Sequence, residues 1–150
     1  MFILNGGPIS WASRRQTVTA LSTSEAELIA LSSAAKELVW LRSLLGDFMM
    51  DVKGPTPIYE DNQATISIAN GRGISGRTKH IDVRHFYVRE QVENRQLEIV
   101  YCASSMQLAD LLTKAVPAEK LRVDCRRFMK VKTQFPSAFA SHVPWPAVQW

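Results

Sequence analysis

The order of the secondary-structure signals predicts an α/β fold with a mixed sheet and flanking helices. Two apolar segments joined by Asn5-Gly6 form an antiparallel hairpin at the start, because Asn-Gly is the strongest short hairpin signal. The later strands alternate with helices, and crossovers of this kind join parallel strands. The length of 150 residues, with 46% hydrophobic and 21% charged residues, fits one ordinary domain with a single core.

The first two elements carry the clearest local signals. We expect the hairpin over residues 1–15 and a long helix over residues 23–45. Ser22 and Glu25 have the spacing of a capping box, and apolar residues then recur at helical spacing. Gly46 is expected to end this helix.

The remaining elements follow from shorter signals. We expect a helix capped by Asp61 or Asn62 and a basic helix whose first turn holds Pro117. In chain order, the predicted elements are a strand at 56–60, a helix to about 70, a basic loop at 71–79, a helix at 80–94, a strand at 97–101, a helix from 104 or 105 to about 114, and a helix to about 130. Residues 1–130 are therefore predicted to form the domain, and 131–150 a poorly ordered tail outside it.

The net charge of +4 is unevenly distributed along the chain. Residues 71–89 hold five basic residues and one acid, and residues 120–132 hold six basic residues and one acid. Such clusters either mark an anionic partner, with nucleic acid first, or are solvated faces. The sequence has no run of about 18 apolar residues and no signal-peptide pattern, so we expect no membrane association and a cytoplasmic or nuclear protein that is not secreted.

Three acids are candidates for catalytic work because each is expected at a strand–helix junction. Glu27 lies near the start of the long helix, Asp61 follows a strand, and Asp110 lies in the helix after the last strand. Each also has a structural explanation: favourable charge at a helix N-terminus for Glu27, a helix cap for Asp61, and an ion pair with Lys114 for Asp110. Carboxylates that converge can bind Mg²⁺, and two such ions can clamp a phosphodiester during cleavage.

Five segments carry a resemblance to a known family. They are Ile-Ser-Trp-Ala-Ser-Arg-Arg-Gln at 9–16, Ala-Leu-Ser-Thr-Ser-Glu-Ala-Glu at 20–27, Glu-Asp-Asn-Gln-Ala at 60–64, Arg-Thr-Lys-His-Ile-Asp-Val-Arg at 77–84, and Gln-Leu-Ala-Asp-Leu-Leu-Thr-Lys at 107–114. In this order they resemble the ribonuclease H (RNase H) region of Ty1/copia-type retrotransposon polyproteins, over about residues 1–130.

The resemblance implies an RNase H-like fold that cleaves the RNA strand of RNA–DNA hybrids, beside a reverse transcriptase domain in a parent polyprotein that is assembled in virus-like particles. It implies two Mg²⁺ ions held by four acids, three of which match Glu27, Asp61 and Asp110. These three are the expected catalytic and metal-binding residues. The residues expected to contact nucleic acid are Arg14, Arg15, Gln16, Asn62, Gln63, Arg77 and Lys79.

The chain departs from the family pattern at its start. The resemblance places the fourth acid on a central first strand that lies before Asn5-Gly6, and we expect this strand to be missing here. The hairpin and the strand at 56–60 should then expose unpaired edges. We therefore expect a truncated domain that is inactive alone. The alternatives are a non-catalytic remnant that binds nucleic acid and a truncated reading frame without a function of its own.

Overall fold

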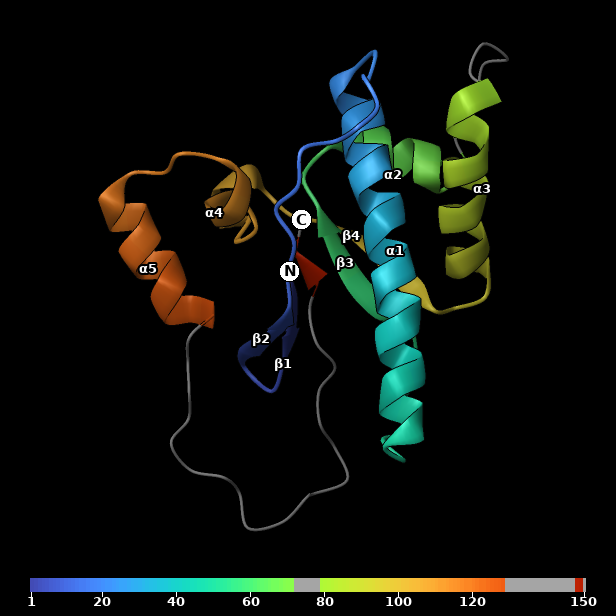
Figure 1. The fold of residues 1–150 in the computed structure, drawn as a ribbon, viewed down its shortest axis with the longest axis horizontal. Coiled ribbons are helices and arrows are strands. Elements are labelled where there is room, and N and C mark those ends of the chain that lie inside the picture. Colours follow the sequence, from blue (N-terminus) through green and yellow to red (C-terminus); the bar gives the residue numbers. More distant parts are fainter. Residues whose placement is uncertain (72–78, 129–147, 150) are drawn as a thin grey trace.

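The computed structural model describes residues 1–71, 79–128 and 148–149, and it confirms a mixed α/β architecture. Within these ranges the sheet has five strands in the order β2-β1-β5-β3-β4 (Figure 1). The strands are β1 (Phe2–Leu4), β2 (Gly7–Ser10), β3 (Thr56–Glu60), β4 (Leu97–Tyr101) and β5 (Val148–Gln149). The helices are α1 (Thr23–Asp47), α2 (Gln63–Ala69), α3 (Lys79–Glu93), the short 3-10 helix η1 (Ser104–Met106), α4 (Asp110–Thr113) and α5 (Ala118–Phe128).

The predicted hairpin is confirmed at its turn. Asn5 and Gly6 have φ values of 52° and 80°, the left-handed conformations that a tight hairpin turn between two strands requires. β1 and β2 are antiparallel, with Ile3 opposite Pro8. The second strand ends at Ser10, before the predicted end of the hairpin, and the chain then runs without regular structure to the start of α1.

Helix α1 begins where the capping box predicted. Ser22 Oγ accepts a hydrogen bond of 3.1 Å from the backbone N–H of Glu25, and Glu25 Oε2 accepts one of 2.6 Å from the N–H of Leu21. The predicted end at Gly46 is wrong, because the helix continues to Asp47. The left-handed residue that closes this end is Met49, with a φ of 58°.

The core lies between α1 and the sheet. Leu31 and Leu38 of α1 are almost completely buried, together with Phe2 of β1 and Ile58 of β3. Strands β3 and β4 are parallel over all five residues, and α2 and α3 form the crossover between them. The same hydrophobic cluster includes residues of α2, α3 and β4, so one core supports α1, β3 and the elements that connect β3 to β4.

Strand β5 lies between the hairpin and β3. Val148 is the antiparallel register partner of Phe2 and the parallel partner of Ile58, and Gln149 is the partner of Tyr59. The expectation of unpaired edges is therefore wrong at these register positions. Of the predicted tail at 131–150, the structure describes only these two residues, and it places them in the sheet (Figure 1).

The C-terminal helices differ from the prediction. Instead of one helix from 104 or 105 to 114, the structure has η1 and α4, separated by residues 107–109, of which Gln107 is extended. The buried Gln107 side chain reaches back to β3, where Nε2 donates to the carbonyl oxygen of Tyr59, and the helix is interrupted at this residue. α5 matches the predicted basic helix. The predicted loop at 71–79 falls almost entirely on residues 72–78, which lie outside the described residues.

No helix in the described ranges combines the length and apolar character needed to cross a membrane.

Candidate functional site

The structure brings the three predicted acids into one electrostatic environment. Glu27 lies in the early part of α1, Asp61 directly follows β3, and Asp110 begins α4. The pKa of Glu27 is raised, first by burial and then by the negative charges of Asp61 and Asp110. Glu27 and Asp110 come from helices α1 and α4, and Asp61 follows strand β3.

Two of the three acids already have cationic or hydroxyl partners. Asp110 Oδ1 lies 2.7 Å from Lys114 Nζ, one helical turn later, so the predicted ion pair is present. Asp61 Oδ2 accepts a hydrogen bond of 2.6 Å from Ser104 Oγ. The hydrogen bond to Asp110 raises the pKa of Lys114, and the charges of Asp61 and Glu27 act in the same direction, whereas partial burial opposes them. A protonated Lys114 therefore contributes positive charge to the acidic cluster.

The cap of α2 is Asn62 and not Asp61. Asn62 Oδ1 accepts hydrogen bonds from the backbone N–H groups of Ala64 and Thr65, at 3.0 and 3.2 Å. The structural explanation considered for Asp61 therefore does not apply, because its neighbour performs that role. The Asp61 carboxylate is instead directed to Ser104, the first residue of η1, which follows β4.

Sequence reasoning missed another acid near the cluster, Glu60, at the end of β3. Glu60 is not the acid that the resemblance places on the missing first strand. Its side chain is only 1% exposed, and Oε1 accepts a hydrogen bond of 2.9 Å from the backbone N–H of Asn62. Burial raises the pKa of Glu60 to about 7, and the charges of Glu27 and Asp61 act in the same direction. The alternation of β3 could have revealed it, since residues 56, 58 and 60 share the buried face.

The three predicted acids, as the described residues place them, are not arranged as a Mg²⁺ site. Carboxylate oxygens are the ligands that Mg²⁺ prefers. Among the described residues, however, no three histidine, cysteine, aspartate or glutamate side chains lie close enough together to hold a metal ion. Lys114 lies against Asp110, where an added cation would be repelled, and Ser104 occupies an oxygen of Asp61. The three acids thus have the right chemistry for Mg²⁺ but not the required geometry.

The predicted nucleic-acid contacts fall into two groups. Arg14 and Arg15 are exposed, on a segment tied down at both ends: Ser13 Oγ donates to the carbonyl oxygen of Leu112 at 2.7 Å, and Gln16 Nε2 donates to that of Ala26 at 2.8 Å. This segment therefore runs from α4 to the first turns of α1, alongside the acidic cluster.

The other predicted contacts are Asn62, Gln63, Arg77 and Lys79. Asn62 is used as the α2 cap, and Gln63 is exposed at the first position of α2. Arg77 lies outside the described residues, and Lys79 is the first residue of α3, although its side chain is not described. Of the predicted contacts, only Arg14 and Arg15 are basic residues whose side chains the structure describes.

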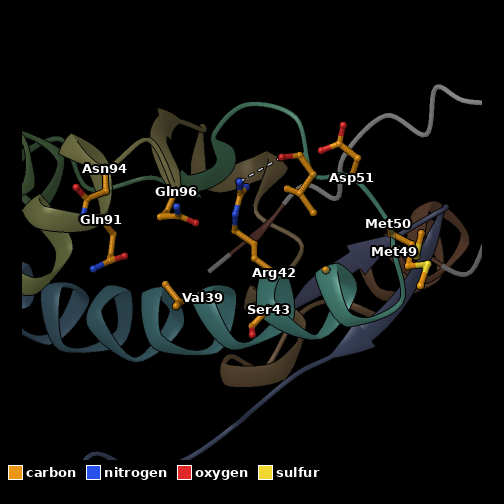
Figure 2. A pocket seen from close by; sticks show the side chains of 11 residues that line it. Val39, Arg42, Ser43, Met49, Met50, Asp51, Gln91, Asn94 and Gln96 are labelled. Carbon is orange, nitrogen blue, oxygen red and sulfur yellow. Dashed lines mark hydrogen bonds between the residues drawn. The ribbon is translucent and has the colours of Figure 1, made fainter.

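A separate cavity of about 960 Å³ lies near the C-terminal end of α1 (Figure 2). Its lining includes Arg42, which donates to the carbonyl oxygen of Gly54 at 3.0 Å and to Thr56 Oγ1 at 2.8 Å. Figure 2 shows the Arg42 side chain directed toward the segment that follows α1. None of the predicted site residues lines this cavity, and Arg42 stabilises the loop that leads into β3.

The comparisons with known proteins give a consistent result. No protein-family model matches the chain, and no solved structure matches it. The chain is 38% identical over 123 residues to the retrovirus-related Pol polyprotein from transposon TNT 1-94 of Nicotiana tabacum. This match covers 82% of this chain and 9% of that protein. It is 35% identical over 107 residues to the Pol polyprotein from transposon RE2 of Arabidopsis thaliana, covering 71% of this chain and 7% of that protein. It is also 28% identical over 126 residues to the transposon Ty1-NL2 Gag-Pol polyprotein of Saccharomyces cerevisiae. This match covers 82% of this chain and 7% of that protein.

The chain thus spans less than a tenth of the length of these curated relatives. Its homologues are Ty1/copia-type retrotransposon Pol and Gag-Pol polyproteins, and the chain corresponds to a short segment of such a polyprotein.

Proposed function

We propose that the chain is a fragment of a retrotransposon RNase H domain, and that the 150-residue chain alone does not cleave RNA. The family activity would be Mg²⁺-dependent cleavage of the RNA strand in RNA–DNA hybrids. The observation that supports this proposal is the cluster of Glu27, Asp61 and Asp110, drawn from three elements around the end of β3. The homology to retrotransposon polyproteins and the five matching segments support it further.

The proposed inactivity follows from the geometry of the same cluster. Two-metal cleavage requires carboxylates that converge on the ions. Here Lys114 is paired with Asp110, and no three potential ligands converge in the described part of the chain. In addition, no residue of the 150 matches the fourth acid that the resemblance implies. A chain with these properties would lack the ability to hold two cations.

Cleavage is tested with a 5′-labelled RNA annealed to complementary DNA. The purified chain, Glu27→Gln and Asp61→Asn are incubated with this hybrid and Mg²⁺, and the products are separated on a denaturing gel. We expect identical, background-level signals from all three proteins. RNA cleavage by the unmodified chain that is lost in either variant would show that the proposed inactivity is wrong.

A second candidate function is nucleic-acid binding without cleavage. It is favoured by the exposed Arg14 and Arg15, which lie on the segment that is hydrogen-bonded to α4 and to the first turn of α1. If these side chains contact phosphates, the logarithm of the binding constant should fall linearly with the logarithm of the salt concentration. Fluorescence anisotropy with a labelled hybrid measures this slope.

The matched variants for binding are Arg14→Ala/Arg15→Ala and Lys53→Ala. Lys53 is an exposed cation before β3, at the end of that strand opposite Asp61. We expect the double variant to bind the hybrid more weakly and with a shallower salt slope, and Lys53→Ala to bind as the unmodified chain does. Equal binding by all three proteins, or binding that does not depend on salt, contradicts this second function.

A further inference from the structure

The cavity near the C-terminal end of α1 is lined from two separate parts of the chain. One side is formed by α1 and the loop that follows it, and it includes Val39 and Arg42 (Figure 2). The other side carries three carboxamide side chains around the end of α3, those of Gln91, Asn94 and Gln96. Its volume of about 960 Å³ lies within the range of small-molecule sites.

Gln91 places a buried polar group in this cavity. Its side chain is 8% exposed and lies in the last turn of α3. No residue in the described part of the chain forms a hydrogen bond with its amide, and Figure 2 shows the side chain extending from α3 toward α1. A buried carboxamide gives up most of its contact with water, so it is costly to leave unpaired. A ligand that supplies both a donor and an acceptor would remove this cost.

The end of α3 holds Gln91 and Gln96 close together. Arg95 adopts a left-handed φ of 55°, and the N–H of Gln96 donates to the carbonyl oxygen of Gln91 at 2.9 Å. The N–H of Arg95 donates to the carbonyl oxygen of Val92 at 3.0 Å, which completes the pair of hydrogen bonds typical of such a helix end. The chain reverses here, so Gln96 returns beside the last turn of α3.

Arg42 reaches the same place through Thr56, which is fully buried at the start of β3. The N–H of Thr56 donates to the carbonyl oxygen of Gln96 at 3.0 Å, and Thr56 Oγ1 accepts from Arg42 Nη1 at 2.8 Å. Figure 2 shows Val39 between Gln91 and Arg42, with Gln96 across from it. An apolar surface is therefore surrounded by two carboxamides, which donate and accept, and by a guanidinium group, which only donates.

We propose that this cavity is a nucleobase site, which takes the uncharged heterocyclic ring of a nucleoside or of a base in a single strand. Base edges present neighbouring donors and acceptors, and glutamine, asparagine and arginine are the side chains that pair with them. The flat face of the ring would lie against Val39. An anion such as phosphate offers acceptors alone, so it would leave the Gln91 carbonyl oxygen unpaired. This site does not depend on the proposed function.

The side-chain NH₂ groups of glutamine and asparagine report binding directly in ¹⁵N–¹H NMR spectra of the full 150-residue chain. Adenosine, guanosine, cytidine and uridine are titrated separately. We expect at least one of them to shift the Gln91 signal saturably, while Asn70, at an exposed position after α2, stays unchanged. Ribose, inorganic phosphate and N-acetylglycine methylamide each lack part of the proposed ligand and should not shift Gln91. No shift with any nucleoside, or an equal shift with one of these three controls, overturns the proposal.

Matched variants separate the amide from the space around it. Gln91→Leu removes the buried amide, and Asn70→Leu removes an exposed amide that does not line the cavity. Nucleoside affinity, measured by calorimetry, should fall at least about tenfold in the first variant and stay within about twofold in the second. Val39→Trp fills the space without changing a polar group and should abolish binding. Undiminished affinity in Gln91→Leu, or in Val39→Trp with an intact urea unfolding transition, contradicts the site.

Competition distinguishes the two sources of the base. A short single-stranded oligonucleotide that contains the preferred base is added to the protein–nucleoside complex. Displacement of the nucleoside, with loss of that competition in Gln91→Leu, identifies a base in a strand as the ligand. Retention of the nucleoside identifies a free nucleoside.

Discussion

Replacement of Glu60 by glutamine should change how the stability of the protein depends on pH. The Glu60 carboxyl is 1% exposed, and burial raises its pKa from the usual 4.5 to about 7. One pKa unit corresponds to about 1.4 kcal/mol, so this shift is worth about 3 kcal/mol. Glutamine keeps the shape of the side chain, and its Oε1 can still accept the hydrogen bond from the N–H of Asn62.

The direction of the pH effect on stability depends on whether the folded or the unfolded chain binds the Glu60 proton more tightly. Below pH 4.5 Glu60 is protonated in both the folded and the unfolded chain. Between pH 4.5 and about 7 the folded chain retains a proton that the unfolded chain has released, so stability falls as the pH rises. Glu60→Gln cannot ionise. Its free energy of unfolding should therefore match that of the unmodified protein near pH 4.5 and exceed it by up to about 3 kcal/mol at pH 8.

The assay is urea unfolding followed by circular dichroism at several pH values between 4.5 and 8. Two other groups also contribute to the pH profile. Burial lowers the pKa of the Met1 amino group to about 6, which favours the folded state as the pH rises from 6 to 8, and the raised pKa of Glu27 acts in the same direction as Glu60. Both groups are present in both proteins, so the difference between the two profiles reports Glu60. Glu98→Gln, at an exposed position on β4, controls for the loss of one negative charge. Parallel profiles for the unmodified protein and Glu60→Gln would refute the reasoning.

Three further predictions test the core, a cap and the acidic cluster. Leu31→Ala, at a fully buried position, should lower the free energy of unfolding by about 2–5 kcal/mol, whereas Leu21→Ala, at a position 89% exposed, should change it by less than about 0.5 kcal/mol; equal effects in urea unfolding would contradict the assigned core. Asn62→Ala should cost about 1 kcal/mol by removing the α2 cap, and Asn62→Asp should restore most of it; an alanine variant of unchanged stability would show that the cap is unimportant. Lys114→Ala should raise the pKa of Glu27 further, because the Lys114 ammonium group lowers it. The variant should change the free energy of unfolding by less than about 0.5 kcal/mol. A carboxyl NMR titration in which the pKa of Glu27 is unchanged would contradict the shared cluster.

Local signals in the sequence predict the turn of the hairpin and the start of α1. Asn5 and Gly6 adopt the expected left-handed conformations, and Ser22 caps the helix as its spacing from Glu25 indicates. Each of these interactions is complete within a few residues, so a short window of sequence contains its cause. The end of α1 is different, because Gly46 remains helical and Met49 adopts the left-handed conformation instead.

The position of β5 could not be predicted from local pattern. Val148 pairs with Phe2 and with Ile58, which are distant from it and from each other in the sequence. A two-residue strand also shows no alternation that distinguishes it from a tail. The interruption between η1 and α4 has a similar cause, since Gln107 contacts Tyr59 of a strand nearly fifty residues earlier.

The sequence indicated candidate acids for the site, but it did not indicate their hydrogen-bond partners or the buried acid next to them. Placement at strand–helix junctions indicated Glu27, Asp61 and Asp110 as candidates, and the charges of Asp61 and Asp110 both raise the pKa of Glu27. It did not reveal Glu60, although the alternation of β3 places Glu60 on the buried face with Thr56 and Ile58. Nor could the sequence show that Asp61 is bonded to Ser104, since this contact joins the end of β3 to η1, 43 residues later.

The most direct test of the central claim is a single-turnover cleavage measurement, with the unmodified chain in excess over a labelled RNA–DNA hybrid in Mg²⁺. Excess protein makes even one slow cleavage event per hybrid visible. We predict that the hybrid stays intact and that Glu27→Gln gives the same result, because no three potential metal ligands lie close together in the described ranges and Lys114 is already paired with Asp110. RNA cleavage by the unmodified chain that is absent in Glu27→Gln would contradict the account.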